Sequence, residues 1–201
     1  LKGKQQGLCD DERFAVQAKQ GRAVFGVDMK IVDDEGKELP WDGQASGELM
    51  VRGPWIIQSY LKGAESPLID GWFPTGDVST IDADGFMQIT DRSKDVIKSG
   101  GEWIGSIDLE NIAMAHPCVQ MAACIAATHA KWDERPLLVV VRKPNTTLTR
   151  EELLSFYEGR IAKWWTPDDV VFVDAIPLGA TGKMLKNRLR EQYGRHLLDK
   201  S

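Results

Sequence analysis

The 201-residue chain has 42% hydrophobic and 27% charged residues, a composition typical of globular proteins and not of disordered or fibrous ones. It carries 25 Lys and Arg against 30 Asp and Glu, a formal charge of −5, which argues against a protein that binds nucleic acid through a general basic surface. No apolar run approaches the roughly 20 residues that a membrane-spanning helix needs. The sequence therefore predicts no membrane span and no nucleic-acid partner.

Cysteine usage and the first residues indicate the compartment. The cysteines Cys9, Cys118 and Cys124 have no spacing typical of metal ligands, and the N-terminus has no basic-plus-apolar leader. We therefore expect a cytoplasmic protein with reduced cysteines and no protein-bound metal. The chain begins with Leu1 rather than Met, which favours a fragment of a longer polypeptide.

The charge is divided unevenly along the chain. Residues 1–91 carry 9 Lys and Arg against 16 Asp and Glu, a net −7, whereas residues 92–201 carry 16 against 14, a net +2. This asymmetry predicts two units with different partners.

The first unit has the pattern of short strands separated by turns. Strands are predicted over 27–32, 47–51, 79–82 and 86–90, and the last two are joined by a turn containing Asp84-Gly85. Strands at this spacing indicate a small barrel or a meander.

In the second unit, strands alternate with helices, which predicts an α+β or α/β fold. A helix is expected over 106–115, with Ser106 near its cap and Ile107 and Ile112 on one side. Thr149 followed by Glu152 forms a capping box that starts another helix. The remaining segments are buried strands over 120–128 and 136–141, a surface turn over 132–136, a short strand over 170–173 and a basic helix over 186–193.

The segment 177–183 (Pro-Leu-Gly-Ala-Thr-Gly-Lys) contains a lysine beside two glycines. It is not a Walker loop, because two residues instead of four separate the glycines and Met184 follows the lysine. The pattern predicts a flexible loop that swings the Lys183 ammonium group onto an anion. An exposed turn ahead of a helix is the alternative, and the loop alone does not decide between them.

Two charged residues lie near the predicted hairpin of the first unit. Asp77 follows a Thr-Gly turn, where a carboxylate can accept two hydrogen bonds from a vicinal diol such as a ribose. Arg92 stands at the end of the hairpin, where its guanidinium can contact the same nucleotide. The alternative is that Asp77 and Arg92 are only paired with each other.

The segment 98–104 has paired glycines followed by a tryptophan. Gly100 and Gly101 permit close approach of a ligand, and Trp103 can provide a flat apolar wall for a thin chain. A tight turn with Trp103 in the core is the alternative interpretation.

In this order, residues 74–77 (Pro-Thr-Gly-Asp), 91–102 (Asp-Arg-Ser-Lys-Asp-Val-Ile-Lys-Ser-Gly-Gly-Glu) and 177–183 resemble the adenylate-forming acyl-CoA ligases, also called AMP-binding enzymes. From residue 21 to 193 the chain is similar to the branch that activates medium-chain fatty acids and 3-methylthiopropionate. Two other motifs of the family, a Ser/Thr/Gly-rich phosphate loop and a Tyr-Gly-x-Thr-Glu-like motif, do not occur in this sequence. The resemblance implies the C-terminal third of such an enzyme, an α+β structure. A remnant of a β-barrel subdomain (1–91) would precede a mobile α/β lid domain (92–201), whose short central sheet is flanked by helices.

The resemblance also implies roles for individual residues. Lys183 would be catalytic in the formation of an acyl-adenylate from ATP and a carboxylic acid. Asp77 and Arg92 would bind the nucleotide, and Lys94 would be the hinge between domains. The residues that would line the coenzyme A tunnel are Ser99, Gly100, Gly101, Glu102 and Trp103. Trp103 stands where the family commonly has Asn or Lys, so it either narrows the tunnel or marks a subfamily.

By the same resemblance, ATP and coenzyme A are substrates, and Mg²⁺ accompanies ATP with its ligands outside this chain. The partner would be the missing N-terminal adenylation domain of the same polypeptide, without which the chain is expected to be inactive. The sequence leaves open which acid is activated and whether copies of the chain associate into a homo-oligomer. A free-standing module that binds a nucleotide or pantetheine without catalysis is the alternative function.

Overall fold

The computed structural model describes residues 3–61 and 65–198, so Leu1 lies outside the described residues. The chain divides into two compact units, Leu1–Ser93 and Lys94–Ser201. Among the described residues, no helix has both the length and the apolar character needed to cross a membrane.

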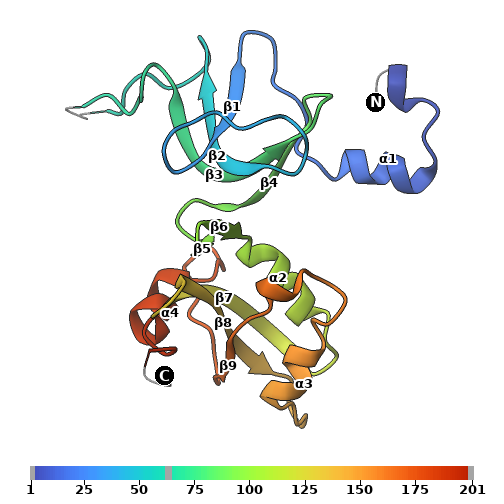
Figure 1. Cartoon of the computed structure of the whole chain (residues 1–201), viewed down its shortest axis with the longest axis vertical. Helices are drawn as coiled ribbons and strands as arrows, with labels where there is room; N and C mark the ends of the chain where they lie inside the picture. Colours follow the sequence, from blue (N-terminus) through green and yellow to red (C-terminus); the bar gives the residue numbers. More distant parts are fainter. Residues whose placement is uncertain (1–2, 62–64, 199–201) are drawn as a thin grey trace. The chain divides into compact units, whose positions relative to one another are not determined.

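The first unit is built around a four-stranded antiparallel sheet (Figure 1). The strands follow one another in space in the order β1-β2-β3-β4, which is a meander, the second of the two predicted arrangements. Ile31, Leu49 and Ile81 form its buried cluster. The elements are η1 (Gly3–Gln5), α1 (Asp10–Gln17), β1 (Asp28–Val32), β2 (Ser46–Arg52), β3 (Phe73–Ile81) and β4 (Met87–Arg92).

The predicted hairpin of the first unit is confirmed as β3–β4. The Asp82 carboxylate accepts hydrogen bonds from the backbone N–H groups of Asp84 (3.0 Å) and Phe86 (2.9 Å). Gly85 adopts a φ of 79°, a conformation that glycine reaches without steric cost. Two features were not predicted: the helix α1, and the extension of β3 back to Phe73, which places Asp77 inside a strand.

The second unit is a sheet with helices on both faces (Figure 1). Its strands lie in the order β6-β5-β8-β7, and β9 pairs with β8 in parallel. The elements are β5 (Ile97–Ser99), β6 (Glu102–Ile104), α2 (Ser106–Met114), β7 (Val119–His129), β8 (Asp133–Arg142), α3 (Arg150–Ser155), η2 (Lys163–Trp165), β9 (Asp169–Phe172) and α4 (Lys186–Tyr193).

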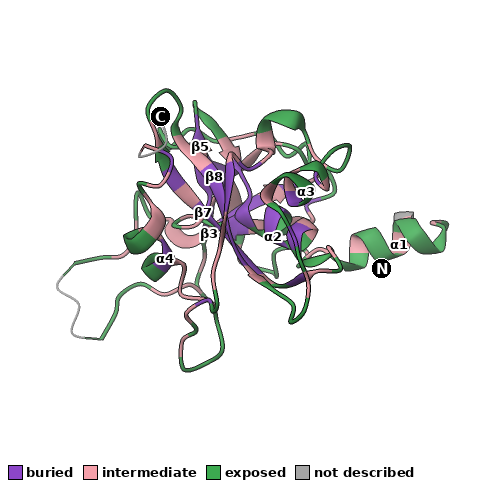
Figure 2. Ribbon diagram, turned by 90° about the horizontal axis from the view of Figure 1, so that it is seen from below, coloured by how far each residue is buried: buried purple, intermediate pink, exposed green. Residues whose placement is uncertain are grey.

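Side chains alternate across β7 and β8, so each strand contributes to two hydrophobic clusters. Cys124 and Leu138 pack with the α2 and α3 residues Leu109 and Leu153. Ile125 and Val139 belong to the other cluster, which includes residues of α4 and the C-terminal segment. Figure 2 shows the buried strands at the centre of this unit. The long, nearly continuous apolar runs of the two central strands therefore reflect burial on both faces. The α+β fold class is confirmed.

Two local predictions for the second unit were wrong. Ile107 is exposed, and the buried face of α2 consists instead of Ser106, Leu109, Glu110 and Ala113. The helix buries a glutamate because that carboxylate has partners inside the unit. Residues 133–136 are the first part of strand β8 rather than a surface turn, because they pair with the end of β7.

Candidate functional site

Asp77 and Arg92 face each other across β3 and β4. They are register partners, and Arg92 Nε lies 3.0 Å from Asp77 Oδ1. Asp77 Oδ1 is buried and accepts no hydrogen bond from the residues that the structure describes, so its approach to Arg92 is an ion pair without hydrogen-bond geometry. The Asp77 side chain is largely buried, whereas the Arg92 side chain is largely exposed. The pairing that the sequence left as an alternative is therefore present.

The Thr-Gly-Asp segment is fixed by one internal hydrogen bond and by hydrogen bonds to β2 and to the residue that follows β4. The Thr75 hydroxyl donates to the carbonyl of Leu49 (3.0 Å) and accepts from the Asp77 N–H (3.1 Å). Gly76 has a φ of 75°, and its carbonyl accepts a hydrogen bond from the Ser93 N–H (3.0 Å). This geometry explains the Thr-Gly pair and fixes the backbone from which the Asp77 side chain projects.

The paired glycines form the turn of the β5–β6 hairpin. Ser99 and Glu102 are register partners, and Gly100 and Gly101 have φ values of 59° and 89°. Positive φ at both central residues is typical of a type I′ turn, which matches the twist of a two-residue hairpin. Lys98 Nζ lies 5.0 Å from the centroid of the Trp103 ring. Trp103 is half-buried and belongs to neither hydrophobic cluster, so the alternative with this ring in the core does not hold.

The hairpin is anchored to the start of β8. The Gly100 N–H donates to the carbonyl of Trp132 (3.0 Å), and the Lys98 N–H donates to the carboxylate of Glu134 (2.8 Å). Arg135 donates to the Ser99 hydroxyl (3.2 Å) and also forms an ion pair with Asp168 (2.8 Å). Sequence reasoning missed these anchors, because the contacts join segments more than thirty residues apart.

Lys183 stands at the end of a tight hairpin turn. The Gly179 N–H donates to the carbonyl of Lys183 (2.8 Å), and the Gly182 N–H donates to the carbonyl of Gly179 (2.9 Å). Gly182 has a φ of 77°, as expected where a turn is followed by a residue in the left-handed region. The segment is thus a turn closed by backbone hydrogen bonds of its own, and it lies ahead of helix α4. That Lys183 is carried onto an anion stays a prediction.

The side chain of Lys183 is exposed and has no hydrogen bond or ion pair with any part of the chain that the structure describes. Lys94 is also exposed and lies in the turn between β4 and β5. Asp77 and Arg92 belong to the first unit, while Lys94, the β5–β6 hairpin and Lys183 belong to the second. The structure thus brings Asp77 together with Arg92, and Ser99 with the other residues of its hairpin.

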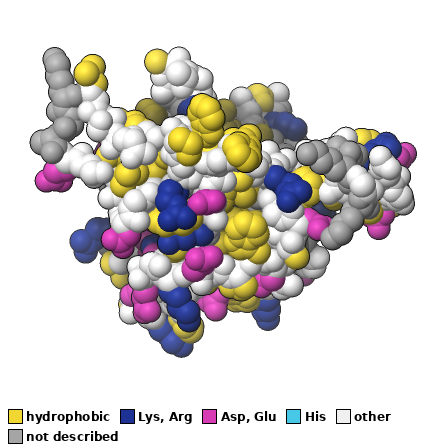
Figure 3. Space-filling view, turned by 90° about the horizontal axis from the view of Figure 1, so that it is seen from above, with side chains coloured by type: hydrophobic (Ala, Val, Ile, Leu, Met, Phe, Trp, Pro, Cys, Tyr) yellow, Lys and Arg dark blue, Asp and Glu magenta, His cyan; other side chains and the backbone are white. Residues whose placement is uncertain are grey.

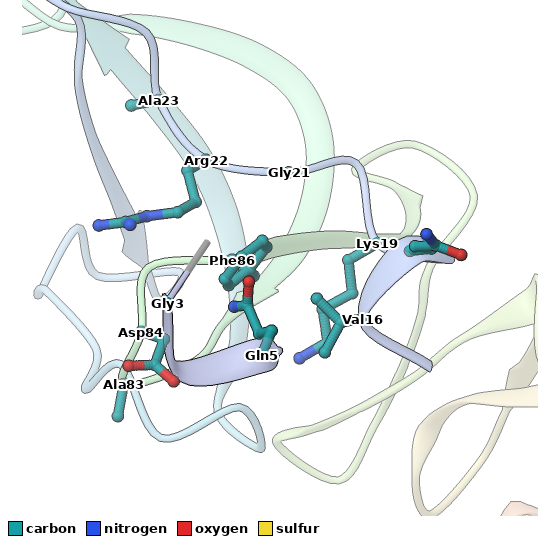
Figure 4. Close-up of a pocket in the computed structure, with 11 residues that line it drawn as sticks. Gly3, Gln5, Val16, Lys19, Gly21, Arg22, Ala23, Ala83, Asp84 and Phe86 are labelled. Carbon is teal, nitrogen blue, oxygen red and sulfur yellow. The ribbon is translucent and has the colours of Figure 1, made fainter. Parts of the chain in front are cut away.

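A separate hollow of about 800 Å³ lies in the first unit (Figure 4). Its lining includes Gln5, Lys19, Arg22 and Phe86, and none of the predicted site residues. Within residues 3–61 and 65–198, no three His, Cys, Asp or Glu side chains are grouped so that they could hold a metal ion.

Large apolar side chains are exposed on the first unit. Phe25 is 97% exposed, and Trp55 and Leu61 are also largely exposed. The indole N–H of Trp55 donates to the carbonyl of Phe25 (3.1 Å), so these two residues are neighbours. Figure 3 shows hydrophobic side chains reaching the surface on the face that it presents.

Comparison with known proteins identifies the family to which the chain is similar. Residues 8–61 match the model of the AMP-binding enzymes, and residues 108–183 match the model of the AMP-binding enzyme C-terminal domain. The second match ends at Lys183.

Curated relatives match nearly the whole chain. The 3-methylmercaptopropionyl-CoA ligase of Ruegeria pomeroyi is 57% identical over 91% of this chain and 34% of its own length. The medium-chain-fatty-acid–CoA ligase of Ectopseudomonas oleovorans is 54% identical over 96% of this chain and 36% of its own length. The chain thus spans about a third of the length of these relatives.

Solved structures of similar proteins point to the same family. ATP-bound MatB from Rhodopseudomonas palustris matches with a TM-score of 0.76 and 34% identity, over 90% of this chain and 36% of that one. The o-succinylbenzoate CoA synthetase MenE from Bacillus subtilis, in complex with an acyl-adenylate, matches with a TM-score of 0.76 and 30% identity, over 91% and 37%. The sequence motifs, the family models and these structures agree on one assignment: the chain belongs to the AMP-binding enzyme family and corresponds to the C-terminal part of its members.

Proposed function

We propose that this chain is the C-terminal third of an ATP-dependent acyl-CoA ligase. In the first step, an oxygen of the substrate carboxylate attacks the α-phosphorus of ATP and pyrophosphate leaves, giving an acyl-adenylate. In the second step, the sulfur of coenzyme A attacks the acyl carbon, AMP leaves, and the thiol proton is released. The observation that carries the proposal is the exposed Lys183, held on a closed turn within a segment that matches the family.

Lys183 would act in the first step. Negative charge builds up where the carboxylate meets the α-phosphate, and a positioned ammonium group stabilises that charge most in the transition state. A lysine already paired inside the protein would have to break that contact first. Lys183 has no such contact with the described residues, which supports its assignment to a substrate.

Asp77 and Arg92 would bind the nucleotide. The buried oxygen of Asp77 accepts no hydrogen bond within residues 3–61 and 65–198, and a ribose hydroxyl that donates to it would satisfy it. The Arg92 side chain is exposed, so its guanidinium is able to turn from the carboxylate to the sugar or the phosphate. The ion pair between them would then be the resting arrangement of a nucleotide site.

The second step would use the β5–β6 hairpin. Ser99, Gly100, Gly101, Glu102 and Trp103 would line the pantetheine tunnel, and Lys94 would be the hinge on which this unit turns between the steps. The type I′ turn and its anchors at Trp132 and Glu134 support this assignment, because they hold a backbone edge at a fixed place. The Trp103 ring, with the Lys98 ammonium against it, would narrow the tunnel.

We infer further that the parent enzyme takes a short or medium-chain carboxylic acid. The relatives at 57% and 54% identity are named for 3-methylmercaptopropionate and for medium-chain fatty acids. The partner would be the N-terminal adenylation domain of the same polypeptide. The exposed Phe25, Trp55 and Leu61 support a covering partner, because a monomer rarely leaves so much large apolar surface in water.

The test separates the two half-reactions in the polypeptide that carries this chain. We expect Lys183→Ala to lower adenylation, measured by pyrophosphate exchange, by roughly 100-fold or more. Thioester formation from synthetic acyl-adenylate should change by less than about fivefold, since that step does not use the ammonium group. Lys143→Ala, at another exposed lysine, is the matched control and should change neither step.

An equal loss of both half-reactions in Lys183→Ala would contradict the role of Lys183. Binding of AMP or coenzyme A by calorimetry, with no turnover of any acid in a panel from 3-methylthiopropionate to medium-chain fatty acids, would instead favour the non-catalytic binding module.

A further inference from the structure

Helix α4 points two cations of one face into its own unit. Lys186 and Arg190 are four residues apart, so their side chains lie on the same side of the helix. Each makes an ion pair with a carboxylate from another element of the unit. Arg188, between them in sequence, is 66% exposed and pairs with its neighbour Glu191 at 3.2 Å.

Lys186 is the more buried of the two inward cations. Its Nζ lies 2.7 Å from Glu110 Oε1 and donates to the Ser106 hydroxyl at 2.7 Å. The side chains of Lys186 and Glu110 are only 10% and 11% exposed. Glu110 Oε1 also accepts the backbone N–H of Cys124 at 2.8 Å. One carboxylate thus joins α2, β7 and the first residue of α4.

Arg190 makes the second contact. Its Nη1 lies 2.8 Å from Asp95 Oδ1, and both side chains are largely buried. Asp95 directly follows Lys94, the residue that we propose as the hinge. The same helix face is therefore tied to α2 at one end and to the hinge segment one turn later.

The tied elements carry the proposed functional loops. Helix α4 begins three residues after Lys183, and the Leu185 N–H donates to the carbonyl of Pro177 at 2.9 Å, which closes the base of that loop. Helix α2 begins at Ser106, directly after the β5–β6 hairpin. A shift of α4 relative to α2 would therefore move the Lys183 turn relative to the β5–β6 hairpin.

We propose that Lys186 and Arg190 are positioning residues that hold the Lys183 turn, the β5–β6 hairpin and the hinge segment as one rigid body. The inference rests on the proposed function, because that function makes these three segments act in one cycle. A rotation at Lys94 then moves the Lys183 turn and the β5–β6 hairpin together, and neither segment has to change its conformation after the rotation.

The chemistry of the Lys186 contact favours positioning over stability. Replacing a buried ion pair with apolar groups of similar size often costs a protein no stability. An apolar contact, however, does not fix the rotation of the helix, whereas Nζ is held here by two oxygens in fixed directions. An error of about 1 Å in the placement of a group can cost about 100-fold in rate.

The experiment uses the full polypeptide. We expect Lys186→Met to lower kcat of both half-reactions by roughly 10- to 100-fold, with KM for ATP and for the acid changed less than about threefold. Lys186→Arg should restore most of the rate, since it keeps a donor to both oxygens. Arg188→Met is the matched control on the exposed side of α4 and should be unchanged.

The double variant Glu110→Gln with Lys186→Met separates positioning from stability. It leaves no uncompensated buried charge, and the amide that replaces the carboxylate still offers an oxygen to the Cys124 N–H. We expect its melting temperature to recover to within a few degrees of the original while kcat stays low. Recovery of kcat together with the melting temperature would overturn the proposal, because Lys186 would then be merely structural.

Hydrogen exchange gives a readout that does not depend on the proposed function. In Lys186→Met, the amides of Leu185 and Gly179 should exchange at least about tenfold faster, while those in the β7–β8 ladder stay protected. No change at these amides would refute the coupling even if Lys183→Ala behaves as proposed. If these amides exchange faster in Lys186→Met while Lys183→Ala keeps normal activity, only the role of Lys183 is contradicted.

Discussion

Gly100 provides a sharp test of the β5–β6 turn. Its φ is 59°, and an added Cβ would lie 2.9 Å from Cε3 of Trp132. The left-handed backbone costs an L-residue about 1–2 kcal/mol, and crowding of a packed site typically adds about 1–3 kcal/mol. Because the Trp132 ring is partly exposed, it can tilt away and recover some of the second cost. We therefore expect Gly100→Ala to lower the free energy of unfolding by about 2–3 kcal/mol.

Gly101 is the matched control next to it. Its φ is 89°, and an added Cβ would meet nothing within 4 Å. Gly101→Ala should therefore cost only the backbone strain, about 1–2 kcal/mol. The difference between the two variants isolates the contact with Trp132.

Urea unfolding of the 201-residue chain, followed by circular dichroism, measures both changes on the transition of the second unit. Combining Gly100→Ala with Trp132→Leu should remove the crowding, leaving a loss close to the sum of Gly101→Ala and Trp132→Leu alone. Equal losses in the two single glycine variants would refute the contact with Trp132. A neutral Gly100→Ala would refute the left-handed conformation itself.

Two other predictions concern the second unit. Tyr157→Phe removes the hydrogen bond from the buried Tyr157 hydroxyl to the carbonyl of Leu109 (2.6 Å), and we expect urea unfolding to report a loss of about 1–3 kcal/mol. A hydroxyl donates only while protonated, and burial raises the pKa of Tyr157, so this loss should be the same at pH 7 and pH 9. The Thr149 backbone N–H donates to the Glu152 carboxylate and lowers the pKa of Glu152 below its ordinary value of 4.5. The capping box therefore stabilises the unit above pH 4.5, and the stability advantage over Glu152→Gln should disappear as the pH falls through the lower folded-state pKa. A stability advantage that persists in strong acid would contradict this assignment.

Signals confined to a few neighbouring residues were sufficient to predict much of the secondary structure. The Thr149 hydroxyl accepts the Glu152 N–H at 3.2 Å, as the capping box predicts, because both partners lie within one helical turn. Helix α4 was predicted with its observed bounds. The β3–β4 turn follows from Asp84-Gly85, since positive φ is available to glycine at no steric cost.

Features that depend on distant partners were not predictable in the same way. Apolar spacing placed Ile107 on the buried face of α2, but the helix turns Glu110 inward because Lys186 and the Cys124 N–H satisfy its carboxylate. The anchor from Arg135 to Ser99 likewise depends on strand pairing that no local pattern specifies. For the candidate site, the sequence left two interpretations of Asp77 and Arg92 open: both contact a nucleotide, or they pair only with each other. The register of β3 with β4 was needed to show that the ion pair exists.

The closed turn at Lys183 changes how the proposed chemistry must work. Two backbone hydrogen bonds hold the turn, and Leu185 joins its base to α4, so the backbone has little freedom to swing by itself. With the backbone held in this way, the ammonium group can move only by rotation about the bonds of the lysine side chain itself. If Lys183 serves one half-reaction and leaves for the other, the movement must therefore belong to the whole unit, turning at a segment such as the one containing Lys94. A rigid support is then an advantage, because the ammonium group returns to the same position in every cycle.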